Sequence, residues 1–200
     1  MINYGNDKKS AVQAKYDAQK IAFGPIMFQA ALAMRNLGIL QALHENRKNG
    51  MTYDEISDQL RISRYGAKVL LEAGISLEMV LVKESRYYLT KTGWFVLNDP
   101  LTKVNMDFTQ DVNYKGFYHL EKAIETGKPE GLKEFGDWDT IYEGLSELPP
   151  DVQKSWFAFD HHYSDSAFSR ALEIVFSGET KPRTLLDIGG NTGKWSLRCA

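Results

Sequence analysis

The sequence predicts a mainly helical protein with a short β-hairpin near its middle and the beginning of an α/β unit at its end. Three observations support this fold class. Apolar residues recur at helical spacing over residues 21–43. Two short β-prone runs flank a polar turn at residues 84–85. An apolar run then meets an acid and a cluster of glycines at residues 184–193, as at the first strand of a nucleotide-binding α/β fold.

The composition is that of a folded protein with a real core. Two hundred residues suit one large domain or two small ones, and 43% of them are hydrophobic. The net charge of −2 provides no global basic field that would favour nucleic acid or an anionic membrane. A single cysteine, Cys199, excludes an internal disulfide framework and fits a reducing compartment.

The N-terminus is polar and has no apolar signal segment. The apolar runs are broken by Gly, Arg or Glu well before the ~20 residues that a membrane span requires. We therefore expect a cytoplasmic protein that makes no membrane contact.

The first part of the chain predicts helices. Residues 1–19 are polar and predict a loose arm or an exposed helix. Residues 21–43 carry a wide apolar face, which is typical of a helix buried on more than one side. Gly38 lies inside this run and could divide it into two helices. Two interpretations stay open: an ordinary core helix, or a helix that is also buried across a homodimer interface.

A helical hairpin follows. Thr52 and Glu55 have the spacing of a capping box, and Ile56 and Leu60 mark a short helix. Ser63 can cap a second helix that ends near Gly74. Two short helices joined by about three residues resemble a helix-turn-helix.

Two predicted strands come next, Met79–Lys83 and Arg86–Thr90, around a turn at residues 84–85. A helical hairpin followed by a β-hairpin is a winged helix. That fold serves either DNA binding or dimerisation. DNA binding needs basic residues, yet residues 52–74 hold three cations against four acids, namely Arg61, Arg64 and Lys68 against Asp54, Glu55, Asp58 and Glu72. Nucleic acid is therefore the less favoured partner.

The second half predicts further helices before the glycine cluster. We expect a helix over Tyr114–Glu125 that stops at Gly127, a short helix within residues 136–148, and a long helix over Asp151–Phe176. Pro149 and Pro150 suit the opening of the long helix, because proline is tolerated in the first turn. A loop over residues 178–183 and a strand over residues 184–188 complete the pattern.

The glycine loop fits one of three ligand motifs. A phosphate-binding P-loop fails because Gly189 and Gly193 are one residue too close, and no hydroxyl follows Lys194. The dinucleotide motif fails because Asn191 stands at its second glycine. The acid-plus-glycine loop of S-adenosylmethionine enzymes, [DE]-x-G-x-G-x-G, matches at Asp187, Gly189 and Gly193. Asn191 replaces its middle glycine, and asparagine tolerates left-handed backbone angles. A turn that merely requires glycines is the remaining alternative.

The order of these features resembles a known family. A winged helix, then the helix with KSWFAFDHHYSDSAF, then LLDIGGNTG is similar to the class I S-adenosylmethionine-dependent O-methyltransferases that carry an N-terminal winged-helix dimerisation domain. The resemblance covers nearly all of residues 20–200. It implies methyl transfer to a small aromatic or polyketide-like hydroxyl compound by a homodimer.

The resemblance also implies site residues. The loop would wrap the methionine moiety of S-adenosylmethionine through Asp187, Gly189, Gly190, Asn191, Thr192 and Gly193, with Ser164 as a polar contact. The helix before the loop would line the acceptor pocket with Phe157, Phe159, His161, His162 and Tyr163, although core packing is an equal alternative for the aromatic residues.

The histidines do not indicate a metal site. His161 and His162 are consecutive and point about 100° apart on a helix, so we expect one to line the pocket and the other to be exposed. No cysteine or carboxylate set has ligand spacing, so no metal is predicted. The family resemblance places the catalytic base in the second half of the catalytic domain. No base is therefore assigned, and we expect His44 and His119 to lie at the surface or an interface.

The sequence thus divides into a winged-helix dimerisation domain (residues 1–100), a helical connector that lines the substrate pocket (101–180), and the start of a Rossmann-like cofactor domain (181–200). We expect the chain to be the N-terminal part of a longer enzyme and to be inactive alone. The alternative functions are a winged-helix DNA-binding regulator and a non-catalytic dimerisation module.

Overall fold

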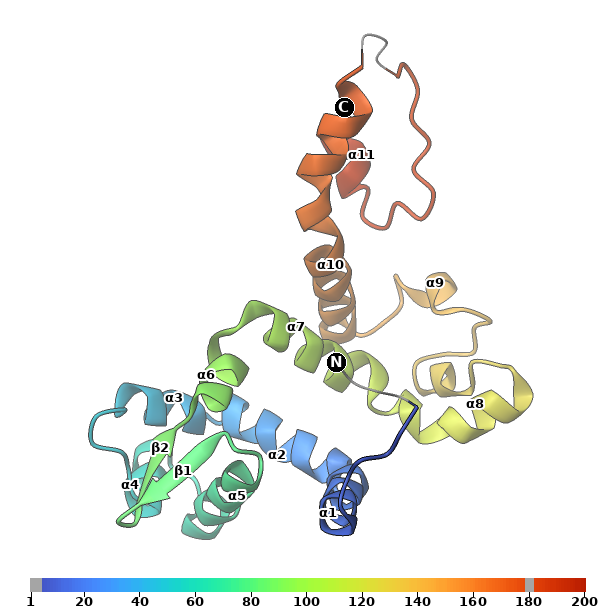
Figure 1. The fold of residues 1–200 in the computed structure, drawn as a ribbon. Helices are drawn as coiled ribbons and strands as arrows, with labels where there is room; N and C mark the ends of the chain where they lie inside the picture. Colours follow the sequence, from blue (N-terminus) through green and yellow to red (C-terminus); the bar gives the residue numbers. More distant parts are fainter. Residues whose placement is uncertain (1–4, 179–181) are drawn as a thin grey trace. The chain divides into compact units, whose positions relative to one another are not determined.

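The structure is a computed structural model that describes residues 5–178 and 182–200. The chain forms two compact units, residues 1–99 and 100–200. The first unit combines helices with one β-hairpin, and the second is helical (Figure 1). The elements of the first unit are α1 (Ala11–Ala22), α2 (Gly24–Asn36), α3 (Ile39–Glu45), α4 (Tyr53–Leu60), α5 (Arg64–Ser76), β1 (Val80–Lys83), β2 (Arg86–Leu89) and α6 (Lys91–Asn98).

The second unit contains one long helix and several short ones. Its α-helices are α7 (Pro100–Phe108), α8 (Leu120–Thr126), α9 (Ile141–Gly144), α10 (Pro150–Phe176) and α11 (Lys194–Cys199). A π-helical turn over Thr109–Asn113 and two 3-10 helices, Gly116–His119 and Glu130–Glu134, connect them.

The N-terminal helices follow the predicted pattern. Helix α1 is capped by Ser10 and buries none of its side chains, which confirms an exposed helix in this region. Gly38 separates α2 from α3 with a φ of 84°, in the left-handed region that glycine adopts without strain. The predicted break of the apolar run is therefore confirmed.

Helices α2 and α3 supply most of the core of the first unit. Among the described residues, the largest fully buried side chains all lie in this unit: Met34, Ile39, Leu40, Leu43, Ile56 and Leu71. By length and composition, no single helix in the described residues could cross a membrane, although α2 and α3 taken together pass the same test with a 55° bend between them.

Caps define the two helices that follow. The Glu55 N–H donates to Thr52 Oγ1, and the Thr52 N–H donates to Glu55 Oε2, so the predicted capping box is confirmed. The Gly66 N–H donates to Ser63 Oγ at 3.0 Å at the start of α5. Each cap satisfies donors that the first turn of a helix leaves without a partner.

The β-hairpin lies where it was predicted. Strands β1 and β2 pair antiparallel, with Val80 opposite Leu89 and Lys83 opposite Arg86. Glu84 and Ser85 both have positive φ values, 49° and 61°, as the tight turn of a two-residue hairpin requires.

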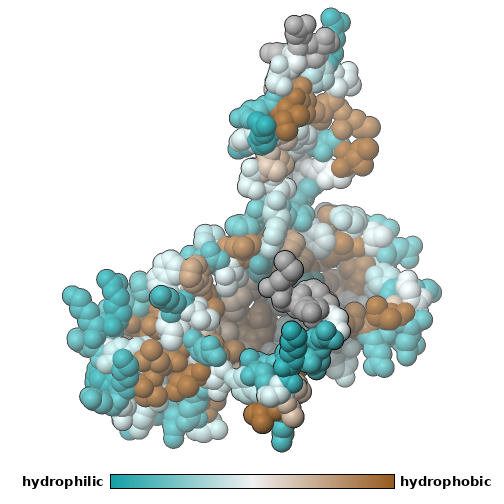
Figure 2. Space-filling model, in the orientation of Figure 1, coloured by the Kyte–Doolittle hydropathy of each residue, from teal (hydrophilic) through white to brown (hydrophobic). Residues whose placement is uncertain are grey.

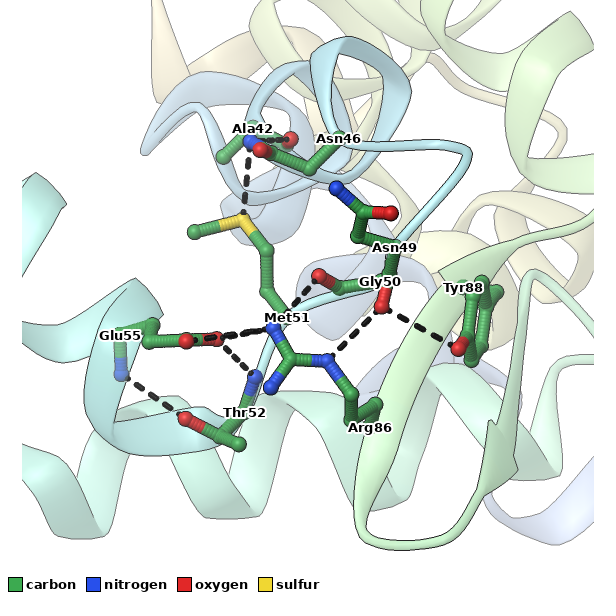
Figure 3. Close-up of polar contacts among 9 residues, drawn as sticks. All are labelled: Ala42, Asn46, Asn49, Gly50, Met51, Thr52, Glu55, Arg86 and Tyr88. Carbon is green, nitrogen blue, oxygen red and sulfur yellow. Dashed lines mark hydrogen bonds and ion pairs between the residues drawn. The ribbon is translucent and has the colours of Figure 1, made fainter.

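Arg86 ties the hairpin to the helices (Figure 3). Its guanidinium donates to the carbonyl oxygens of Asn49 and Gly50 and to the carboxylate of Glu55. Glu55 is also the capping residue that accepts from the Thr52 N–H. One carboxylate therefore joins the start of α4 to β2.

The second unit has its own core. Val112, Leu148 and Val152 are buried and are surrounded by partly buried aromatic residues, including Phe108, Trp138 and Trp156. Helix α10 begins at Pro150, in agreement with the predicted opening at the proline pair.

Several predicted elements of this unit need correction. The helix expected over Tyr114–Glu125 is a 3-10 helix followed by α8, although it stops at Gly127 as predicted. The helix expected within residues 136–148 is reduced to the single turn of α9. Helices α6 and α7 were not predicted.

The strand predicted over residues 184–188 is not formed. Leu186 and Ile188 are 83% and 87% exposed. A strand is stabilised by pairing with a neighbour, and the described residues around this segment offer it none. The predicted loop at 178–183 lies partly outside the described residues.

Hydrophobic side chains also reach the surface of both units, as brown patches between the teal polar ones (Figure 2). Ile21 and Ile26 are the most exposed of these near the start of α2, at 80% and 64%. Surface of this kind is typical of a protein–protein contact when it is contiguous.

Packing at Gly93 leads to a stability prediction. A Cβ at Gly93 would overlap the Met79 carbonyl oxygen and lie 2.6 Å from Leu89 Cδ1. We expect Gly93→Ala to lower the free energy of unfolding by about 1–3 kcal/mol, the usual cost of overpacking. Urea denaturation followed by circular dichroism measures the change.

Gly24→Ala is the matched control, because a Cβ at Gly24 meets no atom within 4 Å. We expect this variant to be as stable as the parent chain or slightly more stable. Equal unfolding midpoints for the two variants would contradict the predicted contact at Gly93.

Candidate functional site

The glycine loop and the middle of α10 enclose a cavity of about 580 Å³ in the second unit. The volume is in the range of small-molecule sites. The cavity is lined by Asp160, His161, Ser164, Ala167, Phe168, Ala171, Asp187, Gly189, Gly190, Asn191, Thr192, Lys194 and Trp195.

The backbone of the loop turns through left-handed conformations. Gly189 and Gly193 have φ values of 73°, and Asn191 has 50°. Asparagine is among the residues that tolerate this region, so its place in the motif carries little strain. The Gly193 N–H donates to the Gly190 carbonyl oxygen at 2.7 Å, which closes the turn before α11.

Two side chains of the loop bond to α10. Asn191 Nδ2 donates to Asp160 Oδ2 at 3.0 Å. Thr192 Oγ1 lies 3.1 Å from His161 Nε2. These contacts join residues 31 positions apart and hold the loop against the helix.

Asp165 is the charged centre of the site. Lys194 Nζ donates to its carboxylate, and His161 Nδ1 lies 3.2 Å from its Oδ1. The hydrogen bond from Lys194, and then the contact with His161, hold the pKa of Asp165 below its ordinary value of 3.8. The carboxylate is therefore ionised at neutral pH.

Two further hydrogen bonds shape the cavity. Ser196 Oγ donates to Asp187 Oδ2 at 2.7 Å, so the acid of the loop is held by α11. Ser164 Oγ donates to the Asp160 carbonyl oxygen at 2.8 Å, within α10. Two aromatic side chains form one side of the cavity: the rings of Phe168 and Trp195 pack together with their centroids 5.3 Å apart.

The predicted aromatic residues lie elsewhere on α10. Phe159 stacks on Phe108 of α7, with ring centroids 4.0 Å apart. Tyr163 donates its hydroxyl to Asn105 Oδ1 at 3.0 Å. Both contacts join α10 to α7: Phe159 packs on this helix, and Tyr163, which is 54% exposed, reaches it through its hydroxyl.

Most of the residues predicted to bind cofactor surround the cavity. Asp187, Gly189, Gly190, Asn191, Thr192 and Ser164 line it, and Gly193 is the residue before α11. Of the acceptor residues, His161 alone lines it, and Phe157, Phe159, His162 and Tyr163 do not. His162 is exposed.

The sequence did not single out Asp160, Asp165 and Lys194. His161 and Asp165 stand four residues apart, a spacing that places two side chains on one face of a helix. The sequence spacing could therefore have predicted the contact between His161 and Asp165. The contact between Asp165 and Lys194 spans 29 residues and could be found only from the folded chain.

No group of three or more His, Cys, Asp or Glu side chains within residues 5–178 and 182–200 could hold a metal ion. His119 lies 2.8 Å from Glu134 in the second unit, and His44 is half-buried on α3.

Part of the first unit is similar to a known domain family. Residues 15–87 match the Dimerisation2-like domain family. The match spans α1 to β2, which is most of the first unit.

The chain as a whole is similar to methyltransferases. It is 27% identical over 185 residues to the L-tyrosine C(3)-methyltransferase of Streptomyces lavendulae, a match that covers 90% of this chain and 49% of that protein. The chain thus spans about half the length of the curated relative it matches.

Solved structures share the fold. The S-adenosylmethionine-dependent methyltransferase SibL matches 92% of this chain and 53% of its own, with a TM-score of 0.66 and 22% identity. Human N-acetylserotonin methyltransferase, solved with S-adenosylmethionine, matches 99% and 57%, with a TM-score of 0.65 and 18% identity. The predicted resemblance to class I S-adenosylmethionine-dependent methyltransferases with an N-terminal dimerisation domain is confirmed.

The Asp165–Lys194 ion pair leads to a pH prediction. Because the folded-state pKa of Asp165 is lowered, its stabilising contribution is present above the ordinary pKa of 3.8 and is lost as the pH falls through the lowered value. We expect Lys194→Met to move the pKa of Asp165 up toward 3.8, so that this contribution is lost at a higher pH. Carboxyl ¹³C NMR titration measures the pKa directly.

Lys154→Met is the matched control, because Lys154 is an exposed cation at the other end of α10. It removes the same net charge, and we expect it to leave the titration of Asp165 in place. If Asp165 titrated at the same pH in both variants, Lys194 would not be the cause of the lowered pKa.

Proposed function

We propose that this chain is part of an S-adenosylmethionine-dependent methyltransferase that acts on a small aromatic hydroxyl compound. The observation that carries the proposal is the cavity itself. Its loop has the acid and glycines of a cofactor motif, and five of the six predicted loop residues, all except Gly193, line it.

The residues present fit S-adenosylmethionine. This cofactor carries an ammonium group, a carboxylate, a sulfonium and an apolar purine. Asp160 and Asp187 provide negative charge in the cavity for its cationic groups, and Lys194 provides a cation. Phe168 and Trp195 provide apolar ring surface. At Gly190 a Cβ would lie 2.8 Å from Asp187 Oδ2, so glycine leaves this carboxylate free of crowding.

The bound cofactor would supply an electrophilic methyl group, and the chain would supply position. Asp187 would be presented to the ligand in a fixed orientation, because Ser196 donates to its Oδ2. Asn191 and Thr192 would keep the loop closed on α10 through their bonds to Asp160 and His161. Holding both reactants in place is the main contribution a protein makes to such a transfer.

The acceptor class follows from the chemistry shared by the predicted and the related reactions. A phenolate is nucleophilic at its oxygen and at the ring carbons beside it, and C3 of tyrosine is such a carbon. A phenolic acceptor therefore accommodates the O-methylation predicted from the sequence and the C-methylation named for the relative. We propose O-methylation, with Phe157, Phe159, His161, His162 and Tyr163 of α10 on the acceptor side.

We also propose the domain division made from the sequence: a winged-helix dimerisation domain over residues 1–100, a connector over 101–180 and the start of a cofactor domain over 181–200. Helices α4 and α5 followed by the β-hairpin support the first part. The boundary at 180/181 lies outside the described residues. A cytoplasmic homodimer is the form we propose.

The DNA-binding alternative is less favoured. The basic side chains of the helical hairpin and β2 are largely neutralised within the unit: Arg64 pairs with Asp54, Lys68 with Glu72, and Arg86 with Glu55. A DNA-binding surface instead needs cations that can reach phosphates.

Asp187 provides the test of the cofactor site. We expect Asp187→Asn to weaken the binding of S-adenosylhomocysteine by about 10- to 100-fold, because a hydrogen bond to a charged group contributes about 1.5–3 kcal/mol. Isothermal titration calorimetry on the 200-residue chain measures the affinity.

Asp58→Asn is the matched control, because Asp58 is an exposed acid on α4 in the other unit. Its affinity should equal that of the parent chain. A parent chain that did not bind the ligand, or an Asp187→Asn variant that bound it equally well, would contradict the proposed cofactor site.

Self-association is tested at α2. Ile26 is 64% exposed near an apolar groove of about 660 Å³ that α1, α2 and the end of α5 form within the Dimerisation2-like domain. We expect Ile26→Glu to weaken dimerisation more than about tenfold, because a charge in the centre of an interface is costly to bury. Analytical ultracentrifugation measures the dissociation constant.

Ile174→Glu is the matched control, since Ile174 is 62% exposed on α10 of the second unit. This variant should dimerise like the parent chain. Equal weakening by both variants would contradict a specific contact at Ile26 of α2, and a monomeric parent chain would exclude the proposed dimer.

A further inference from the structure

Lys194 is the one lysine or arginine among the described residues that line the cavity beside the glycine loop. Two carboxylates, those of Asp160 and Asp187, line the same cavity. His161 is the other basic side chain there, and both of its ring nitrogens already have polar contacts. An anionic group that entered the cavity would therefore be repelled by the two acids and attracted at Lys194.

The ammonium group of Lys194 is held in place and still has donors to offer. Its Nζ donates to the carboxylate of Asp165 on α10, which fastens the side chain. A lysine ammonium has three N–H donors, and this hydrogen bond uses one of them. The Lys194 side chain is 45% exposed, so the other donors are accessible to a ligand.

Asp165 prepares Lys194 for a ligand without competing for all of its donors. A long lysine side chain loses rotamer freedom when it binds a ligand, and a contact made beforehand removes part of that cost. Asp165 is itself oriented on α10, because His161 Nδ1 lies 3.2 Å from its Oδ1. The Asp165 contact can persist when a ligand binds, so the loop stays fastened to α10.

The charges of S-adenosylmethionine complement this pattern. Its amino-acid end carries one carboxylate and one ammonium group, and the sulfonium adds a second positive charge. The carboxylate is the one anionic group of the cofactor, and Lys194 is the matching cation. The two positive groups match Asp160 and Asp187 instead. The reverse orientation would place the carboxylate of the cofactor against those acids, which costs free energy.

We infer that Lys194 binds the carboxylate of the cofactor and raises the preference of the site for cofactors that keep this group. The inference rests on the proposed cofactor site and assigns to it a specificity-determining residue. A decarboxylated cofactor leaves the Lys194 ammonium without its anion. Its complex therefore lacks one charge-assisted hydrogen bond.

The test compares two ligands in two forms of the chain. One ligand is S-adenosylhomocysteine, and the other is S-adenosyl-3-thiopropylamine, the same molecule without its carboxylate. We expect Lys194→Met to weaken binding of the first about 10- to 100-fold and to leave the second nearly unchanged, because only the first has the group that Lys194 binds. Lys194→Arg should restore part of the loss, because it keeps the positive charge. Isothermal titration calorimetry on the 200-residue chain measures the affinities.

Two control variants separate a ligand contact from other effects. Lys154→Met removes the same charge from an exposed position on α10 and should leave both affinities unchanged. Asp187→Asn should weaken both ligands, because both keep the ammonium group. If Lys194 only held the loop on α10, Lys194→Met would likewise weaken both ligands to the same extent.

Equal weakening of the two ligands by Lys194→Met, or no weakening of S-adenosylhomocysteine, would overturn the inference and leave the proposed cofactor site in place. A parent chain that did not bind S-adenosylhomocysteine would refute the cofactor site, and the inference with it. A loss confined to the ligand that carries the carboxylate, with partial recovery in Lys194→Arg, is the result that supports the inference.

Discussion

The cavity depends on the side-chain contacts that hold the glycine loop against α10. Asn191 donates to Asp160, Thr192 contacts His161, and Lys194 pairs with Asp165. Residues 184–186, before the loop, are exposed and form no helix or strand, so these contacts set the position of the loop. Asp160 and His161 are consecutive on α10 and Asp165 lies about one turn further on, so the three contacts hold the loop and the start of α11 against one short stretch of the helix.

Helix α10 connects the core of the second unit to the site. Its first turns bury Val152 and Ser155, and Ser155 donates to Asp111 at 2.5 Å in the π-helical turn. Its middle carries Asp160, His161 and Asp165. Helix α10 is 27 residues long and is held rigid by backbone hydrogen bonds between residues four positions apart. Packing at one end therefore fixes the direction of the whole helix. The core that fixes one end thus also orients the side chains that contact the loop.

The first unit is built differently. Its core lies at α2 and α3, and the Arg86–Glu55 contact fastens the hairpin to the capping box of α4. Its apolar side chains that remain exposed, such as Ile21 and Ile26, lie where a partner can cover them. The similarity to the Dimerisation2-like domain family agrees with such a surface, and Arg64 and Arg86 are paired with acids of the same unit.

The sequence by itself determined the elements that depend on neighbouring residues. The capping box at Thr52 and Glu55, the break at Gly38, the hairpin turn at residues 84–85 and the opening of α10 at Pro150 were all predicted, because caps, turns and proline act within a few residues. The cofactor motif was also recognisable, because its acid and glycines lie within seven residues. Only the tertiary structure decided that residues 184–188 do not form a strand, that Phe159 packs on α7, and that Lys194 reaches Asp165. Strand pairing and contacts across 29 residues depend on which distant segments the folded chain brings together. The spacing of residues along the sequence does not predict those contacts.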